Sequence, residues 1–142
     1  MDSQHSGHSG YRNLWVVGIL SGITGGLYNI YLAFRWAAEI NELAGTKKVN
    51  PSVVLLVSAL SLGLGVLVFE CVFARDLESI AEDRGEVSLI TGFSTVIIAL
   101  NVSAVLLIMS GVGIILGLPL GIAATVLIQR QFNALIDPLA SE

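Results

Sequence analysis

Long apolar runs, separated by short charged stretches, dominate the pattern of this chain. The runs are near or above the length of about 18 residues that marks a candidate transmembrane helix. They cover residues 14–36, 53–73, 87–109 and 112–130. The pattern therefore predicts an all-α integral membrane protein, with about four transmembrane helices in one domain over residues 13–136.

Two features modify these predicted helices. The glycine-rich segments 22–26 and 63–65 favour breaks in the first two runs. A broken helix survives in a bilayer only where protein buries it, so re-entrant hairpins in the first half remain an alternative. Helical spacing of apolar residues continues into the charged stretches 35–45 and 74–84. These stretches are predicted to be amphipathic extensions that anchor a span at the interface or dock a partner.

Composition agrees with the apolar pattern. Of the 142 residues, 54% are hydrophobic and 13% are charged, whereas soluble chains carry about 25% charged residues. The net charge of −4 provides no basic stripe for nucleic acid, which we exclude as a partner. The polar residues 1–12 lack the apolar core of a signal peptide and are predicted to be a disordered tail. Residues 137–142 form a C-terminal tail.

The expected location is the cell membrane, as a multi-pass protein. Lysine and arginine are almost evenly divided between alternate loops. This small bias leads us to place both termini in the cytoplasm.

The chain also contains a faint internal repeat. Related tripeptides open three glycine-rich stretches: Leu20-Ser21-Gly22, Val57-Ser58-Ala59 and Met109-Ser110-Gly111. Each is followed by an apolar half-helix and an acidic or amide-bearing segment: residues 39–43, 76–80 and 131–135. Repetition would indicate one structural unit used several times. Chance matching in a chain rich in Leu, Gly and Ser explains the pattern equally well, so both explanations stay open.

One segment is similar to a known family. Residues 19–31 (Ile-Leu-Ser-Gly-Ile-Thr-Gly-Gly-Leu-Tyr-Asn-Ile-Tyr), then Trp36 and residues 39–43, resemble the opening of a family of small prokaryotic multi-span membrane proteins, domain of unknown function 4234. The resemblance is strongest over residues 14–45, and the second copy has residues 64–68 where the family pattern would place Tyr. It implies a multi-span helical fold, and it implies no activity because the family has none established.

Glycines spaced four apart are the clearest packing signal. One ridge is formed by Gly18, Gly22 and Gly26, and the other by Gly113, Gly117 and Gly121. Missing side chains let two helix backbones approach closely. Because glycine is common in membrane helices, chance alignment is the alternative explanation. The partner helix could belong to the same chain or to another.

Polar side chains inside the apolar runs are the second candidate site. Thr91, Ser94 and Asn101 share one face of the third run. We expect this face to contact protein, as hydrogen-bonding glue between helices or as part of a polar path. Glu70, near the end of the second run, is expected to reach water or to pair with an arginine such as Arg35 or Arg75. A proton-relay role for Glu70 is the alternative.

Catalytic constellations are not recognisable in the sequence. His5 and His8 have the spacing of metal ligands but lie in the predicted tail, without a carboxylate cluster. A membrane enzyme would have only Glu70, Cys71 and Asp76 to use. We therefore predict a protein that is not an enzyme and that needs no metal or cofactor.

Two functional hypotheses follow. The leading one is a small membrane protein that acts through helix–helix packing, as an accessory or structural subunit of a larger membrane complex or as a homo-oligomer. Its expected partners are the lipid bilayer and either other membrane subunits or a second copy. The alternative is a small transporter or channel that uses Glu70 and the polar stripe of the third run.

Overall fold

The computed structural model describes residues 12–24, 26–86, 90–110 and 113–136, without the side chains of 113–115. This part of the chain is helical, which confirms the all-α prediction. The helices are α1 (Leu14–Ile23), α2 (Leu27–Ala44), α3 (Pro51–Leu60), α4 (Leu64–Asp83), α5 (Phe93–Met109) and α6 (Gly113–Ile136). Apart from Arg12, the predicted N-terminal tail lies outside the described residues, as does the tail at 137–142.

The prediction of four transmembrane helices is wrong. The first apolar run breaks between Ile23 and Leu27, and the second breaks between Leu60 and Leu64. The resulting α1 and α3 have 10 residues each, so each is about 15 Å long, half the thickness of a bilayer core. Across the described ranges, none of the helices combines the length and the apolarity needed to cross a membrane. We inferred three further features from those spans: a multi-pass cell-membrane location, cytoplasmic termini and re-entrant hairpins. These predictions are wrong for the same reason.

Local turn chemistry explains both breaks. Gly26 and Gly63 have φ angles of 96° and 93°, in the left-handed region where a side chain causes strain. Their N–H groups donate to the carbonyls of Ser21 and Ser58, five residues earlier, at 3.2 and 2.8 Å. These bonds satisfy helix-end acceptors, so each helix ends and the chain turns back.

The two helix–turn–helix units are copies of one structure. An offset of 37 residues relates Asn13 to Asn50, Ser21 to Ser58, and Gly26 to Gly63. In both copies the asparagine caps the first helix: Asn13 accepts from the N–H of Trp15, and Asn50 from that of Ser52. Chance matching therefore does not explain these two copies. The α5–α6 pair repeats the same order of helix, turn and helix with a longer first helix.

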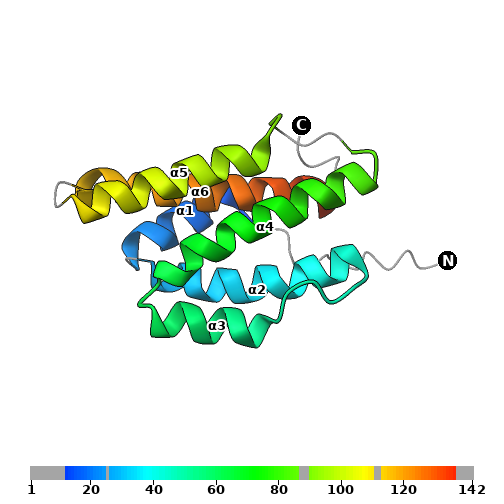
Figure 1. Ribbon diagram of the computed structural model, residues 1–142, viewed down its shortest axis with the longest axis horizontal. Helices are drawn as coiled ribbons and strands as arrows, with labels where there is room; N and C mark the ends of the chain where they lie inside the picture. Colours follow the sequence, from blue (N-terminus) through cyan, green and yellow to red (C-terminus); the bar gives the residue numbers. More distant parts are fainter. Residues whose placement is uncertain (1–11, 25, 87–89, 111–112, 137–142) are drawn as a thin grey trace.

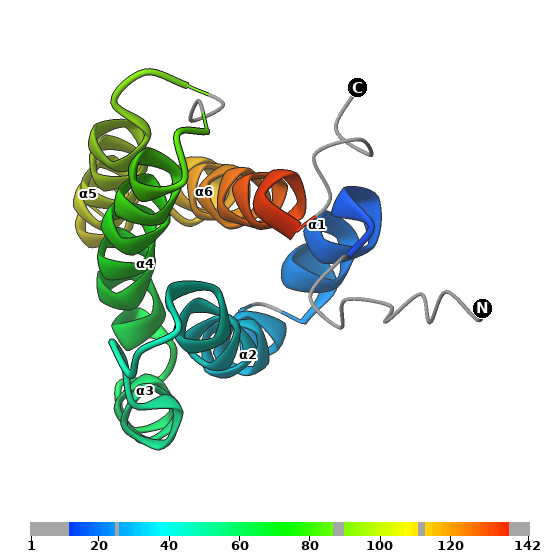
Figure 2. The same cartoon turned by 90° about the vertical axis from the view of Figure 1, so that its right-hand side faces the viewer.

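The repeat produces an inner and an outer group of helices. Helices α2, α4 and α6 run in one direction, while α1, α3 and α5 run in the opposite direction (Figure 1). Helix α3 packs on α2 and α4, α5 packs on α4 and α6, and α1 packs on α6 and α2. The end-on view shows this arrangement around a common centre (Figure 2). The turns that join α1 to α2, α3 to α4 and α5 to α6 consequently lie at the same end of the molecule.

The centre is built from equivalent positions on the three inner helices. Buried residues recur three and four apart: Ala33, Trp36, Ala37 and Ile40 in α2, Glu70, Phe73, Ala74 and Leu77 in α4, and Thr125, Ile128, Gln129 and Phe132 in α6. Trp36 stacks on Phe132 at a ring-centroid distance of 5.9 Å and meets Phe73 edge-on at 6.2 Å. The polar side chains Glu70 and Thr125 occupy equivalent positions in the layer nearest the turns, so the core contains a polar centre.

Candidate functional site: a buried carboxyl group beside a cavity

Glu70 lies at the polar centre of the core. Its side chain is completely buried, although it belongs to a helix whose second half is charged. Thr125 Oγ1 in α6 donates to Glu70 Oε1 at 2.7 Å, and Asn101 Nδ2 in α5 donates to Glu70 Oε2 at 3.0 Å. Three helices therefore hold one carboxyl group through neutral hydrogen-bond partners.

The burial of Glu70 sets its protonation. Desolvation raises the pKa of Glu70 from 4.5 to about 7, while the hydrogen bonds from Thr125 and Asn101 oppose the rise. An ionised Glu70 accepts both hydrogen bonds. A protonated Glu70 can donate to Thr125 Oγ1, because Thr125 can turn its own proton to the carbonyl of Gly121 at 3.0 Å. The site can thus gain or lose a proton near neutral pH without losing its hydrogen bonds.

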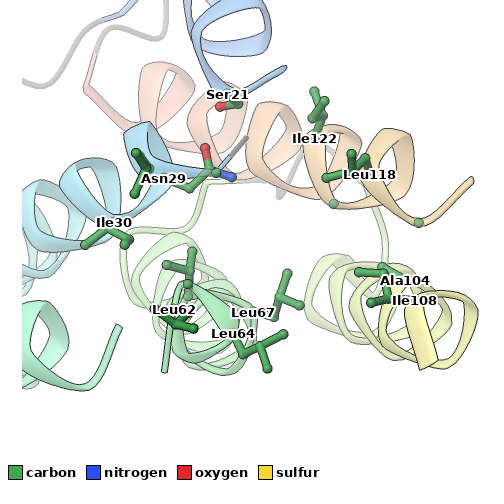
Figure 3. A pocket seen from close by; sticks show the side chains of 16 residues that line it. Ser21, Asn29, Ile30, Leu62, Leu64, Leu67, Ala104, Ile108, Leu118 and Ile122 are labelled. Carbon is green, nitrogen blue, oxygen red and sulfur yellow. The ribbon is translucent and has the colours of Figure 1, made fainter. Parts of the chain in front are cut away.

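The hydrogen-bonded chain continues to a cavity. Asn29 Nδ2 in α2 donates to Thr125 Oγ1 at 3.2 Å. Asn29 Oδ1 and Ser21 Oγ are both buried without a hydrogen-bond partner, and both residues line a cavity of about 170 Å³. Figure 3 shows these two side chains toward one end of the cavity, with Ala104 and Ile108 toward the other. Both oxygen atoms are themselves buried, so the cavity does not expose them.

A second buried carboxyl group, Glu39 in α2, has charged partners. Arg12 donates Nη1 to Glu39 Oε2 at 3.1 Å and Nη2 to Oε1 at 2.6 Å, a two-pronged ion pair. Arg35, one turn earlier in α2, lies 3.6 Å from the same carboxylate. Glu39 is therefore neutralised by guanidinium groups, as a buried charge requires.

The same arginine connects the start of the described chain to α6. Arg12 Nη1 also donates to Gln129 Oε1 at 3.1 Å, and this oxygen accepts from Trp36 Nε1 at 2.9 Å. Asn133 Oδ1 accepts a hydrogen bond from the backbone N–H of Arg12, and Asn133 Nδ2 donates to the Arg12 carbonyl at 2.7 Å. This second cluster ties α2 and α6 together beside the ring of Trp36.

The glycines of the first predicted ridge lie in different surroundings. A Cβ on Gly18 would lie 3.5 Å from Val126, and one on Gly22 would lie 3.6 Å from Ile122, both ordinary contacts with α6. Gly26 instead forms the turn before α2 with a positive φ angle. The first two glycines therefore face α6, and the third is needed for the break.

In the second ridge, Gly117 approaches a neighbouring helix more closely than any other glycine in the described part of the chain. A Cβ on Gly117 would lie 2.8 Å from the Ile108 side chain and 3.0 Å from the Ala104 carbonyl in α5. A Cβ on Gly121 would have no neighbour within 4 Å, because Gly121 lines the cavity. Gly113 begins α6, and its surroundings lie outside the described side chains.

The polar stripe is only partly assembled. Asn101 is buried against Glu70, whereas Ser94 is half-buried in the first turn of α5 and Thr91 is exposed before that helix. The expectation that Glu70 reaches water or pairs with Arg35 or Arg75 is wrong: its partners are Asn101 and Thr125.

Sequence reasoning also missed several parts of the two clusters. They are Ser21, Asn29, Thr125 and the Arg12–Glu39 pair. The repeat carried a usable signal, because its register places Thr125 in α6 where α4 has Glu70.

Two further chemical candidates, Cys71 and Asp76, lie within the described part of the chain. The thiol of Cys71 donates to the Leu67 carbonyl at 3.3 Å, and burial raises its pKa, which disfavours the thiolate. Burial also raises the pKa of Asp76, against the opposing charge of Lys48. His5 and His8 lie outside the described residues.

The fold and the site define an all-helical protein built from repeated helix pairs around a buried carboxyl group. The chain belongs to the family described as domain of unknown function (DUF4234), whose model matches residues 12–136, most of its length. This match confirms the resemblance, and its description states neither an activity nor a location. Neither the curated proteins nor the solved structures that were compared contain a match.

Proposed function

We propose that this protein is not an enzyme and acts through helix packing, as a homo-oligomer whose subunits meet at the end of the molecule that carries the inter-helix turns. We call this surface the turn end. It consists of six apolar side chains, each more than half exposed: Ile23, Leu27, Leu60, Leu62, Leu64 and Met109.

The apolar exposure of the turn end supports this proposal. Leu62 is 94% exposed and Met109 is 81% exposed. Single exposed apolar residues are normal, but clustered ones mark interaction surfaces, because covering them removes apolar area from water. The three turns lie toward the same end of the bundle, with the end of α5 projecting beyond the α1–α2 and α3–α4 turns (Figure 1).

Leu62 is also unfavourable in its own backbone. Its φ of 53° is the one positive value at a non-glycine residue in the described part of the chain. Leucine in this left-handed region costs about 1–3 kcal/mol relative to an unstrained residue. A strained and exposed leucine is unfavourable in the isolated monomer, which supports a role in contacting a partner.

A second copy is the partner that suits this surface. Residues 20–28, 57–67 and 106–110 contain no charged side chain, so the partner surface must be apolar as well. The turn end of another copy meets that requirement, and a two-fold interface joins one patch to itself. The other copy would then cover the apolar groups that the monomer leaves in water.

Native mass spectrometry and light scattering of the purified protein test this proposal. Leu62→Asn should abolish self-association while keeping or raising thermal stability, because asparagine tolerates a positive φ. Val53→Asn, at an exposed apolar position in the first turn of α3, is the matched control and should leave the mass unchanged.

The outcomes separate the hypotheses. A monomeric wild-type protein at tens of micromolar, or equal masses for both variants, would contradict the homo-oligomer. A stoichiometric partner of a different sequence would replace it by the accessory subunit of a larger complex. The alternative of a small transporter or channel stays a prediction, and the Glu70–Asn101 contact is the one part of its polar stripe observed in the structure.

A further inference from the structure

The helices that carry the turn end also carry the groups that hold Glu70. Thr125 in α6 links two of these groups, because its hydroxyl accepts from Asn29 and donates to Glu70. In each of three helices, a turn-end side chain and a member of the Glu70 cluster belong to the same element: Leu27 and Asn29 in α2, Leu64 and Glu70 in α4, and Met109 and Asn101 in α5. The state of Glu70 therefore acts on the helices that position the turn end.

Ionisation of Glu70 places a negative charge where no ion pair compensates it. In the described part of the chain, the ion pairs of the buried carboxyl groups involve Glu39 and not Glu70. An unpaired carboxylate in the core is costly, and contact with water relieves this cost. Asn101 and Thr125 cover one carboxyl oxygen each, so water reaches Glu70 only when α5 or α6 moves away from α4.

The titratable side chains of the surrounding helices do not set the charge of Glu70. Helices α3 and α5 have none, and α6 has only Arg130. Those of α2 are Tyr28, Tyr31, Arg35, Glu39 and Glu42, and the next ones along α4 are Cys71 and Arg75. Burial raises the pKa of Glu70 to about 7, and the opposing causes are the hydrogen bonds from Thr125 and Asn101. Burial, and then the charge of Glu70, also raise the pKa of the Cys71 thiol, so Cys71 stays protonated near neutral pH.

A second copy on the turn end opposes the movement that hydrates Glu70. It would hold Leu64 and Met109 against one surface, and these residues belong to α4 and α5, which must separate. Each copy in the oligomer therefore binds the Glu70 proton more tightly than the monomer does. By linkage, protonation strengthens association by the same factor.

We propose that Glu70 is a proton-dependent switch of self-association: the turn ends of two copies join while Glu70 is neutral and separate once it is ionised. This inference rests on the proposed homo-oligomer and adds the regulation of its contact. The pKa of Glu70, about 7, places the transition near neutral pH.

Light scattering of the purified protein from pH 6 to pH 8 tests the proposal. The Kd of self-association should rise about tenfold over this range, because each copy of a dimer contributes a factor of about three. Glu70→Gln, whose amide stays neutral, should associate at pH 8 as tightly as the wild type does at pH 6. Glu82→Gln, at an exposed carboxyl group on the same helix, is the matched control and should keep the wild-type pH dependence. His5 and His8 titrate in the same range, but every variant retains them.

A second measurement follows the proton itself. Carbon NMR of the Glu70 carboxyl group, assigned by its absence from the Glu70→Gln spectrum, gives the midpoint of its titration. The midpoint should be lower in the monomeric Leu62→Asn variant than in the associated wild type, since association and protonation favour each other. This comparison needs no substitution in the core.

The outcomes separate this inference from the proposed function. Equal Kd values at pH 6 and pH 8 would overturn the switch and leave the homo-oligomer standing. A Glu70→Gln variant that keeps the wild-type pH dependence, or equal NMR midpoints in Leu62→Asn and the wild type, would do the same. A protein that is monomeric at every pH would contradict the proposed function as well.

Discussion

Glu39 and Glu70 are two buried carboxyl groups in the same helical core, and the protein stabilises them in opposite ways. Glu39 has a two-pronged bond from Arg12 and a second guanidinium from Arg35. Glu70 has only the Thr125 hydroxyl and the Asn101 amide. Glu39 is a carboxylate whose charge is neutralised by guanidinium groups. Glu70 instead has a pKa of about 7, so its neutral form is populated at physiological pH.

Their surroundings differ in the same direction. Glu39 lies near the stacked rings of Trp36 and Phe132, where packing is tight. Glu70 connects through Thr125 and Asn29 to a cavity. The Glu39 cluster is charge-paired and closely packed, whereas the Glu70 cluster is neutral and connects to open volume. The comparison therefore separates a structural centre from a candidate functional one.

The largest expected effect comes from breaking the charged centre. Arg12→Ala should lower the free energy of unfolding by about 3–5 kcal/mol, because it removes the two-pronged bond and leaves the buried carboxylate with Arg35 alone, 3.6 Å away. Urea denaturation at pH 7 measures this loss. Adding Glu39→Gln to the Arg12→Ala variant should recover a large part of it. A loss below about 1 kcal/mol would show that the pair behaves like an exposed salt bridge.

The neutral centre should respond to pH instead. The pKa of Glu70 is raised in the folded protein from 4.5 to about 7, so the folded state binds its proton more tightly than the unfolded state does. This contribution is fully present below pH 4.5 and is lost as the pH rises through 7. By pH 8 the ionised group should cost about 3 kcal/mol.

Glu70→Gln isolates this dependence. The amide keeps both hydrogen bonds, with its oxygen accepting from Asn101 and its nitrogen donating to Thr125. The variant should therefore exceed the wild type in stability at pH 8 by about 3 kcal/mol and match it near pH 4. Urea denaturation across this range provides the measurement. A wild-type curve as steep as that of the variant would contradict the assigned role of Glu70.

The smallest expected effects concern packing near the neutral centre. Gly121→Ala should raise stability by about 0.5–1 kcal/mol, because the added methyl enters open volume and favours the helix. Gly117→Ala, one turn earlier, should lower stability by about 1–3 kcal/mol because it meets α5. Thermal unfolding of both variants measures the difference. Equal effects would contradict the open volume beside Gly121.

Local structure was largely readable from the sequence. Asparagine caps at residues 13 and 50 and glycines at 26 and 63 define where helices start and end through their own backbone chemistry. The apolar runs predicted helices correctly, but apolarity alone does not decide whether a helix continues through a glycine. The four predicted spans failed for that reason, although the glycine-rich segments where two of them break were visible.

The candidate site depended on contacts between distant segments. Asn101 meets Glu70 from 31 residues away, and Thr125 meets it from 55. Arg12 reaches Glu39 across 27 residues and Gln129 across 117. Hydropathy placed Glu70 near the end of an apolar run, but it carries no information about which helix lies opposite.

By itself, the sequence determined the helical class and the family, whereas it left the repeated helix–turn–helix unit undecided. The tertiary structure decided that the turns gather at one apolar end, that Glu39 receives cations while Glu70 does not, and that a cavity opens beside Glu70. The physical reason is range: capping, glycine turns and helical periodicity act within a few residues. Desolvation and hydrogen bonding depend on whichever side chains the packed helices bring together.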